Sequence, residues 1–220
     1  MLNWLRENSA AANVALNFAM LLVWIAYLQV FVSNYRRQRR ASILINVGGG
    51  PGLDARCLVS NMSQDAIYIR SLIFDLTTAE GTSSRSVTEI EDLEDWKGPT
   101  DLNLWTRQGP LTAGSVRDMG TFRAMLDHAL RARTAPAAPS AIASVDLIEQ
   151  VRVTVIAHYG PEDLLVAAEQ TYTFDRRDGA TWLIPQAVTP RQIRSRAERG
   201  RIMTRLEQEV RKSVERSSSR

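Results

Sequence analysis

The sequence has little of the residue chemistry that marks most enzymes. Among 220 residues it contains one cysteine, Cys57, and two histidines, His128 and His158. A single cysteine excludes an intrachain disulfide, which is compatible with a reducing compartment. Neither histidine has a second histidine or an acid at metal-ligand spacing, and neither has a neighbour that would orient it as a base. We therefore assign no catalytic, cofactor-binding or metal-binding residues and expect a protein without enzymatic activity or cofactor.

Three further patterns are better explained by structure than by chemistry. Cys57 falls in an alternating pattern over 53–59, which predicts a buried position in a strand. The glycine cluster at 48–52 is followed by that strand pattern and not by a lysine and a helix, so we interpret it as a turn and not as a phosphate-binding loop. The acidic run at 89–95 lacks the alternating ligands and central glycine of a calcium loop, and we interpret it as a solvated edge.

Charge is absent from residues 14–32, which are almost entirely apolar. As a helix this stretch would be about 28 Å long, close to the roughly 30 Å hydrocarbon core of a bilayer. A buried core helix is the alternative, but so long a run that is apolar on all sides is rare at the centre of a domain with about 180 residues to cover it. The sequence therefore predicts a single transmembrane helix over 14–35.

The flanks of this helix predict its orientation. Residues 1–13 carry only Arg6 and Glu7, so they lack the basic region of a cleaved signal peptide. Four arginines lie in 36–40, a stop-transfer stem that places the carboxyl side in the cytoplasm. We thus predict a single-pass protein of a bacterial inner membrane, with a short extracytoplasmic segment at 1–13. The bacterial origin is inferred from the near absence of lysine, of which the chain has only Lys97 and Lys212.

The net charge of +3 hides an uneven distribution along the chain. Residues 41–190 hold 12 basic and 19 acidic residues, whereas 191–220 hold 10 basic and 4 acidic ones. Because the excess positive charge lies in the stem and in this tail, we expect anionic lipid and not nucleic acid as the partner of the basic segments. The residue pattern of this tail predicts a basic helix from Pro190 to about Val214 with a thin apolar seam. Such a helix can pair with another helix, lie on a membrane or remain solvated.

Residues 41–190 are the right size for one domain and are dominated by strand patterns. These patterns cover 42–47, 53–60, 66–76, 102–107, 151–158, 164–174 and 182–184, with polar or turn-forming segments such as 77–86 between them. One helix is predicted over 121–132, because its apolar residues form a single stripe; they are Phe122, Met125, Leu126, Ala129 and Leu130. A proline- and alanine-rich stretch follows at 134–144.

The fold class predicted from these patterns is mainly β. An antiparallel, immunoglobulin-like β-sandwich with one inserted short helix follows the membrane helix, and a basic helix ends the chain. The strand over 66–76 is apolar on both faces and is expected at the centre of a sheet. Strict alternation places Ile67, Ile69 and Ile73 on one face and Tyr68, Leu72 and Phe74 on the other.

Three functions remain open on this architecture. The first is a membrane-anchored, non-enzymatic interaction or scaffold module that presents its sandwich to a protein partner. The second is an accessory subunit of a larger membrane complex. Asn17, Gln29 and the alanine pair Ala15 and Ala19 would then dock against another span, and the transmembrane helix could also form a homo-oligomer. The third and least favoured is a membrane-associated enzyme.

Overall fold

A computed structural model of the chain describes residues 9–38, 40–79, 81–88, 106–131, 145–161, 165–177, 180–204 and 206–207. The chain divides into two compact units, 1–40 and 41–220, which we describe separately. Three predicted segments lie wholly or largely outside the described residues: the acidic run at 89–95, the strand at 102–107 and the proline-rich stretch at 134–144.

The first unit contains helix α2 (Ser9–Gln38), which is longer than the predicted span. Its stretch Ser9–Tyr35 is long and apolar enough to cross a membrane. The large apolar side chains from Val14 to Tyr35 are each 36–69% exposed, so they are not buried by the described part of the chain. The predicted N-terminal apolar helix is therefore confirmed.

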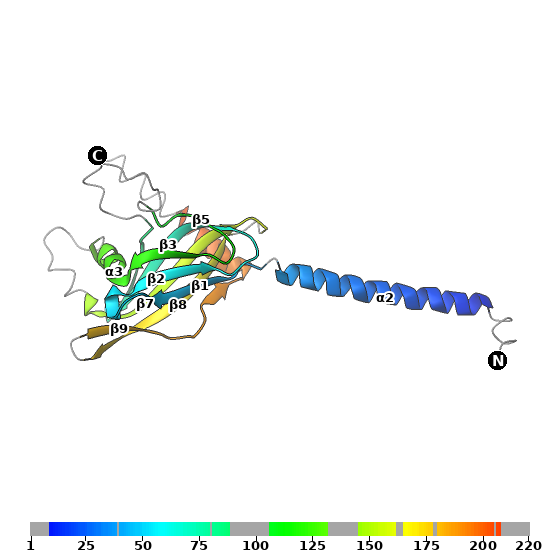
Figure 1. Ribbon diagram of the computed structural model, residues 1–220, viewed down its shortest axis with the longest axis horizontal. Coiled ribbons are helices and arrows are strands. Elements are labelled where there is room, and N and C mark those ends of the chain that lie inside the picture. Colours follow the sequence, from blue (N-terminus) through cyan, green and yellow to red (C-terminus); the bar gives the residue numbers. More distant parts are fainter. Residues whose placement is uncertain are drawn as a thin grey trace. The chain divides into compact units, whose positions relative to one another are not determined.

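The second unit is built on two antiparallel sheets, which confirms the prediction of a mainly β protein (Figure 1). The smaller sheet has the order β1 (Ile43–Gly48), β2 (Arg56–Asn61) and β6 (Val116–Thr121). The larger sheet has the order β10 (Arg191–Ile193), β8 (Val166–Arg177), β7 (Ile148–Tyr159), β3 (Ile67–Thr78) and β4 (Gly81–Ser86). In addition, β5 (Gly109–Leu111) pairs with β3 and β9 (Ala180–Pro185) pairs with β8.

Both sheets contribute to one hydrophobic core. Ile43, Ile45, Cys57 and Val59 come from the smaller sheet, and Phe74, Val153 and Tyr172 are among the residues from the larger one. Helix α3 (Phe122–Arg131) adds the whole of its predicted stripe to this core, and all five side chains are buried. The Phe122 ring lies 5.3 Å from Tyr172 in an edge-on arrangement, an orientation that aromatic pairs favour.

The turn predicted in the glycine cluster is confirmed, because β1 and β2 form an antiparallel hairpin around it. Residues 53 and 54 belong to a short 3₁₀ helix, η1 (Gly52–Asp54), and not to the strand that follows. Gly52 has a φ of +57°, and a Cβ atom there would lie 2.6 Å from the carbonyl oxygen of Thr181. A glycine is thus required where η1 meets β9.

Strand β3 is central, as predicted, but the assignment of its faces is wrong after Arg70. Its pairing with β7 shifts between Ile69 and Ser71, where a β-bulge inserts one extra residue. An extra residue reverses which face each later side chain occupies. Leu72 therefore joins Ile67 and Ile69 in the shared core, as do Phe74 and Leu76, while Ile73 points to the opposite face.

The predicted polar loop at 77–86 is also wrong, because β3 runs to Thr78 and residues 81–86 form strand β4. The sequence of β4, Gly-Thr-Ser-Ser-Arg-Ser, has no apolar alternation. It is a strand because it pairs with β3 from Thr78 to Ile73, so backbone hydrogen bonding to an existing strand determines its conformation.

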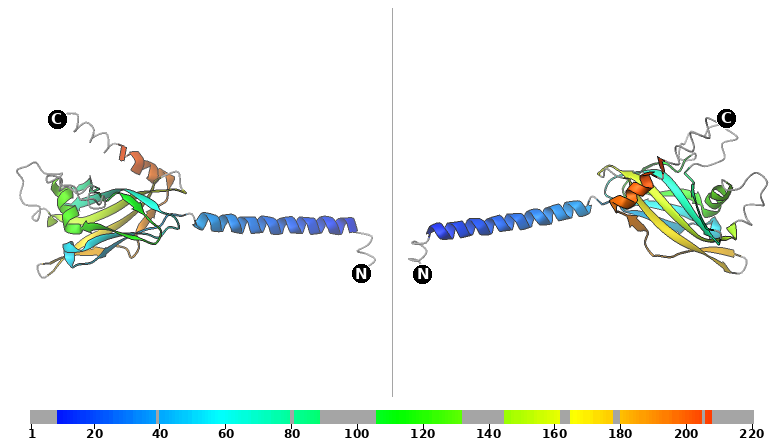
Figure 2. Two further views of the ribbon diagram at one scale, coloured as in Figure 1. Left: turned by 45° about the horizontal axis from the view of Figure 1, so that its top comes forward. Right: turned by 180° about the vertical axis from the view of Figure 1, so that it is seen from behind.

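The C-terminal segment differs most from its prediction. Residues 191–193 form strand β10, which pairs antiparallel with Glu169 to Ala167 of β8, so the predicted helix does not begin at Pro190. The helix begins at residue 196 and is described for 196–204 and 206–207; we call it the C-terminal helix. Its apolar seam is partly buried, with Ala197 and Met203 exposed. Ile193 and Leu206 are buried in a second apolar cluster with residues of the larger sheet, namely Ile73, Ile156, Leu165 and Ala167. Figure 2 shows this helix lying across that sheet.

This packing predicts the consequence of ending the domain at residue 190. A fragment of residues 41–220 should fold with a β-dominated circular dichroism spectrum, whereas 41–190 should lose about 3–6 kcal/mol of stability from the missing burial of two aliphatic side chains. Urea unfolding of the two fragments measures the difference. Equal midpoints and slopes would contradict the described packing of Ile193 and Leu206.

Candidate functional site

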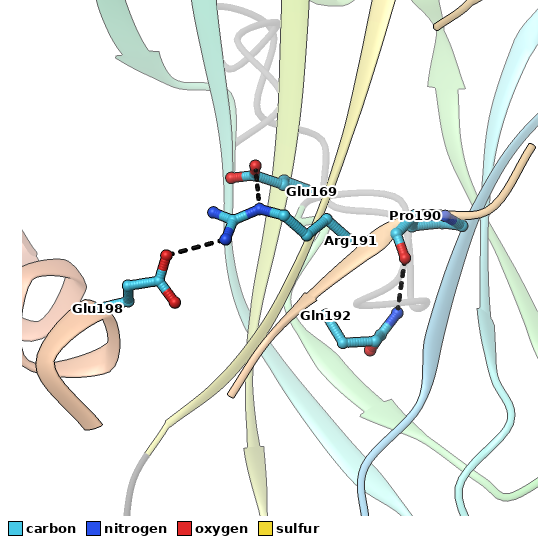
Figure 3. Close-up of polar contacts among 5 residues, drawn as sticks. All are labelled: Glu169, Pro190, Arg191, Gln192 and Glu198. Carbon is cyan, nitrogen blue, oxygen red and sulfur yellow. Dashed lines mark hydrogen bonds and ion pairs between the residues drawn. The ribbon is translucent and has the colours of Figure 1, made fainter. Parts of the chain in front are cut away.

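The most distinctive polar arrangement joins the start of the second unit to its C-terminal segment. The side-chain amide of Gln192 pairs with the backbone of Ile43: the Ile43 N–H donates to Oε1 at 3.1 Å, and Nε2 donates to the Ile43 carbonyl at 2.7 Å. Nε2 also lies 3.5 Å from the Pro190 carbonyl oxygen (Figure 3). The amide thus supplies β1 with the two hydrogen bonds that a neighbouring strand would otherwise supply. It does so across 149 residues of sequence.

Next to this pair, Arg191 connects the sheet to the C-terminal helix. Its Nε donates to Glu169 Oε1 at 2.7 Å and its Nη1 to Glu198 Oε1 at 2.8 Å (Figure 3). Glu169 belongs to β8 and is the least exposed of the three side chains, at 17%, against 30% for Glu198 and 56% for Arg191. We call Ile43, Glu169, Arg191, Gln192 and Glu198 the junction.

The charges of the junction stabilise one another. The hydrogen bond from Arg191 holds the pKa of Glu198 below its usual value, and hydrogen bonds to Glu169 and then Glu198 raise the pKa of Arg191. Because the pKa of Glu198 is depressed in the folded state, its contribution to stability is present above its unfolded pKa and is lost as pH falls through the folded one. Exposed pairs of this kind contribute little individually. The main effect of these ion pairs is therefore to fix the position of the C-terminal helix relative to β8.

The junction contains no activated nucleophile and no group poised as a base. The two histidines that the sequence offers lie elsewhere. His128 is half-buried on α3, and His158 is exposed on β7 with its Nε2 3.4 Å from Nη1 of Arg70. Within the described ranges, no group of three or more His, Cys, Asp or Glu side chains could hold a metal ion.

Cys57 is fully buried in the core, as its strand pattern predicts. Burial raises the pKa of its thiol to about 12, an effect that outweighs the attraction of the nearby Arg107 guanidinium. A thiol with this pKa is almost entirely protonated near neutral pH and is a poor nucleophile.

Arg107 is a buried charge that sequence reasoning did not single out. Its side chain joins strand β6 to the segment after β4 by donating Nε to the Met119 carbonyl at 2.5 Å and Nη1 to the Val87 carbonyl at 2.6 Å. Burial lowers its pKa. Backbone carbonyls satisfy this guanidinium, so its role is to hold the smaller sheet beside residues 87–88 and not to present a charge to a ligand.

No local sequence signal could have identified the junction. Arg191 and Gln192 fall in the segment predicted to form a basic helix, and their partners Ile43 and Glu169 lie in strands with ordinary patterns. Only the three-dimensional arrangement brings them together. Comparison of the chain with protein-family models, with curated proteins and with solved structures finds no significant match.

The state of Cys57 predicts its reactivity. With a thiol pKa of about 12, roughly one thiol in ten thousand is ionised at pH 8. A thiol reagent such as Ellman's reagent should leave the native chain unmodified and titrate one thiol per chain after denaturation. Rapid stoichiometric reaction of the native chain would show that Cys57 is accessible.

The two hydrogen bonds between the Gln192 amide and Ile43 predict a loss of stability when Gln192 is replaced. Replacing Gln192 by alanine removes both hydrogen bonds to Ile43 and leaves its backbone groups without these partners, which should cost about 1–3 kcal/mol. The matched control is Gln186→Ala, because the Gln186 amide makes one exposed hydrogen bond of 3.3 Å to Gln150. That control should cost less than about 0.5 kcal/mol in urea unfolding. Equal effects of the two variants would show that the hydrogen bonds between Gln192 and Ile43 do not stabilise the fold.

Proposed function

We propose that this protein is a membrane-anchored, non-enzymatic interaction or scaffold module. In this proposal α2 spans the bacterial inner membrane with its amino end outside. The β domain is an immunoglobulin-like sandwich held at the cytoplasmic face, where it binds a protein partner.

The observation that carries the proposal is the uncovered apolar surface of α2. Its large side chains between Val14 and Tyr35 are all exposed, and none of the apolar window in this helix is buried. Each aliphatic or aromatic side chain of this size gains about 1.5–3 kcal/mol on leaving water, so a dozen or more favour an apolar surrounding by tens of kcal/mol. At 1.5 Å per residue, the 27 residues of Ser9–Tyr35 extend about 40 Å, enough to cross a bilayer of roughly 30 Å.

The proposed orientation is supported by charge alone. Arg36, Arg37, Arg39 and Arg40 follow the apolar stretch, whereas Arg6 is the one basic residue before it. Because basic residues close to a span remain on the cytoplasmic side, this difference favours a cytoplasmic β domain.

A protein partner is supported by apolar side chains on the surface of the β domain. Trp182 and Ile184 lie on one face of β9 and are 46% and 45% exposed, and Val188, which follows the strand, is 99% exposed. Exposed aromatic and aliphatic residues gathered on one strand are typical of protein-binding surfaces.

Replacing Leu22 and Ile25 of full-length protein by arginine tests the anchor and its orientation together. The two charges should cost about 2.5–3.5 kcal/mol each near the centre of a span, so the variant should be released from membranes by alkaline carbonate. Wild type and the matched Leu22→Ala, Ile25→Ala variant should remain membrane-bound. A reporter fused after Arg220 should be active only if it requires the cytoplasm. Release of wild type would exclude the anchor, and activity of a periplasmic reporter would reverse the orientation.

A further inference from the structure

We propose that the end of the β domain nearest to α2 in the chain faces lipid, and that Arg194 and Arg196 there bind the phosphates of anionic lipid headgroups. The junction holds these two arginines at that end. This inference rests on the proposed membrane anchor and names a second partner for the same protein.

The chain between α2 and the domain is too short to let this end move far from the membrane surface. Three Cα steps separate Gln38, the last residue of α2, from Ala41, and they extend at most about 11 Å. From Ala41 onward the chain is fixed, because Ala41 is buried and the Ser42 N–H donates to Ser63 Oγ at 2.9 Å. The Met62 N–H in turn donates to the Ser42 carbonyl at 2.8 Å.

The junction brings the C-terminal segment to this same end. Gln192 is hydrogen-bonded to Ile43, two residues after Ala41, and Arg194 and Arg196 lie two and four residues after Gln192 in the chain. The first strand of the domain and the beginning of the basic tail are therefore adjacent, although 149 residues separate Ile43 from Gln192 in sequence.

Arg194 and Arg196 are the available charges of this segment that lie nearest to Gln192 in the chain. Both are exposed, and neither has a hydrogen bond or ion pair with any residue in the described part of the chain. Arg191 is already paired with two carboxylates, and Arg199 is buried and donates to the Ile193 carbonyl. The surface of the domain also carries acidic charge. Asp65 is exposed and accepts a hydrogen bond from Tyr159.

The mode of binding follows from what the C-terminal helix has already buried. Ile193 and Leu206 pack against the larger sheet, so they are not available for insertion into a bilayer. The contact that we propose for this segment therefore depends on the charges of Arg194 and Arg196, and charge attraction reaches only about one Debye length, roughly 10 Å at 0.1 M salt. The proposal therefore requires the short connection from α2 to hold the arginines within about that distance of the headgroups.

The opposite end of the domain provides an internal reference. Gln192 pairs with Ala168 of β8, and Ala180 pairs with Arg177 of the same strand. Nine strand residues between positions 168 and 177 correspond to about 30 Å. A probe at Ala180 therefore lies beyond the reach of the headgroups if the proposed end faces them.

The test uses full-length protein in nanodiscs made of phosphatidylcholine alone or mixed with an equal amount of phosphatidylglycerol. A fluorophore is attached to Ala197→Cys or to Ala180→Cys, both exposed positions, while the buried Cys57 stays unmodified. Headgroup-attached quenchers report proximity to the surface. Quenching at 197 should be about twofold or more stronger in the anionic discs, and should fall as 1 M salt shortens the screening length to about 3 Å. Quenching at 180 should not change.

Charge variants distinguish lipid binding from mere closeness to the disc. Arg194→Ala with Arg196→Ala should reduce quenching at 197 to the neutral-lipid level, and Arg194→Lys with Arg196→Lys should retain most of the difference. If the chain stays in the discs but 197 is quenched equally in both lipids, or no more than 180, the inference is overturned and the anchor stands. If the chain is not retained in the discs, both are overturned.

Discussion

The three-residue strand β10, together with the side-chain amide of Gln192, connects the C-terminal segment of the β domain to its first strand. Strand β10 pairs with β8, and the Gln192 amide satisfies the Ile43 backbone at the beginning of β1. The pairing also sets the position from which the C-terminal helix crosses the larger sheet. Without it, the second apolar cluster would lose Ile193 and Leu206, and β1 would have backbone groups without these partners.

The interactions that stabilise this connection are apolar burial and ion pairs, which differ in their contribution to the free energy of folding. Burial of aliphatic side chains accounts for most of its free energy, because each is worth about 1.5–3 kcal/mol. The ion pairs of Arg191 are exposed and individually weak, but they join Glu169 of the sheet to Glu198 of the helix and so favour one arrangement of the two. Apolar contact thus supplies the stability, and the polar groups specify the register.

Much of the fold could be predicted from local patterns. The stripe from Phe122 to Leu130 and the hairpin formed by β7 and β8 follow from periodicity alone, and both are as predicted. The errors occur where a distant partner determines the local structure. The polar sequence of β4 is a strand because β3 is beside it, and the bulge at Arg70 reverses the later faces of β3 without any signal in the residue types.

The candidate site could be predicted less well than the fold, for the same reason. The basic character of residues 191–220 is plain in the sequence. Which of its arginines are paired (Arg191), buried (Arg199) or exposed (such as Arg194 and Arg196) depends on where the segment docks. A count of charges treats these arginines as equal. Packing makes only some of them available to a partner.

We propose that a lipid-embedded helix leads directly into a domain whose first strand is fixed by the C-terminal segment. Hydrogen exchange of the full-length chain in lipid nanodiscs tests both parts at once, because it reports protection of individual amides. We expect slow exchange throughout the apolar stretch of α2, and protection of the Ile43 amide comparable to that of the central strand β7. Rapid exchange in α2, or an Ile43 amide that exchanges like an exposed loop while β7 stays protected, would contradict the account.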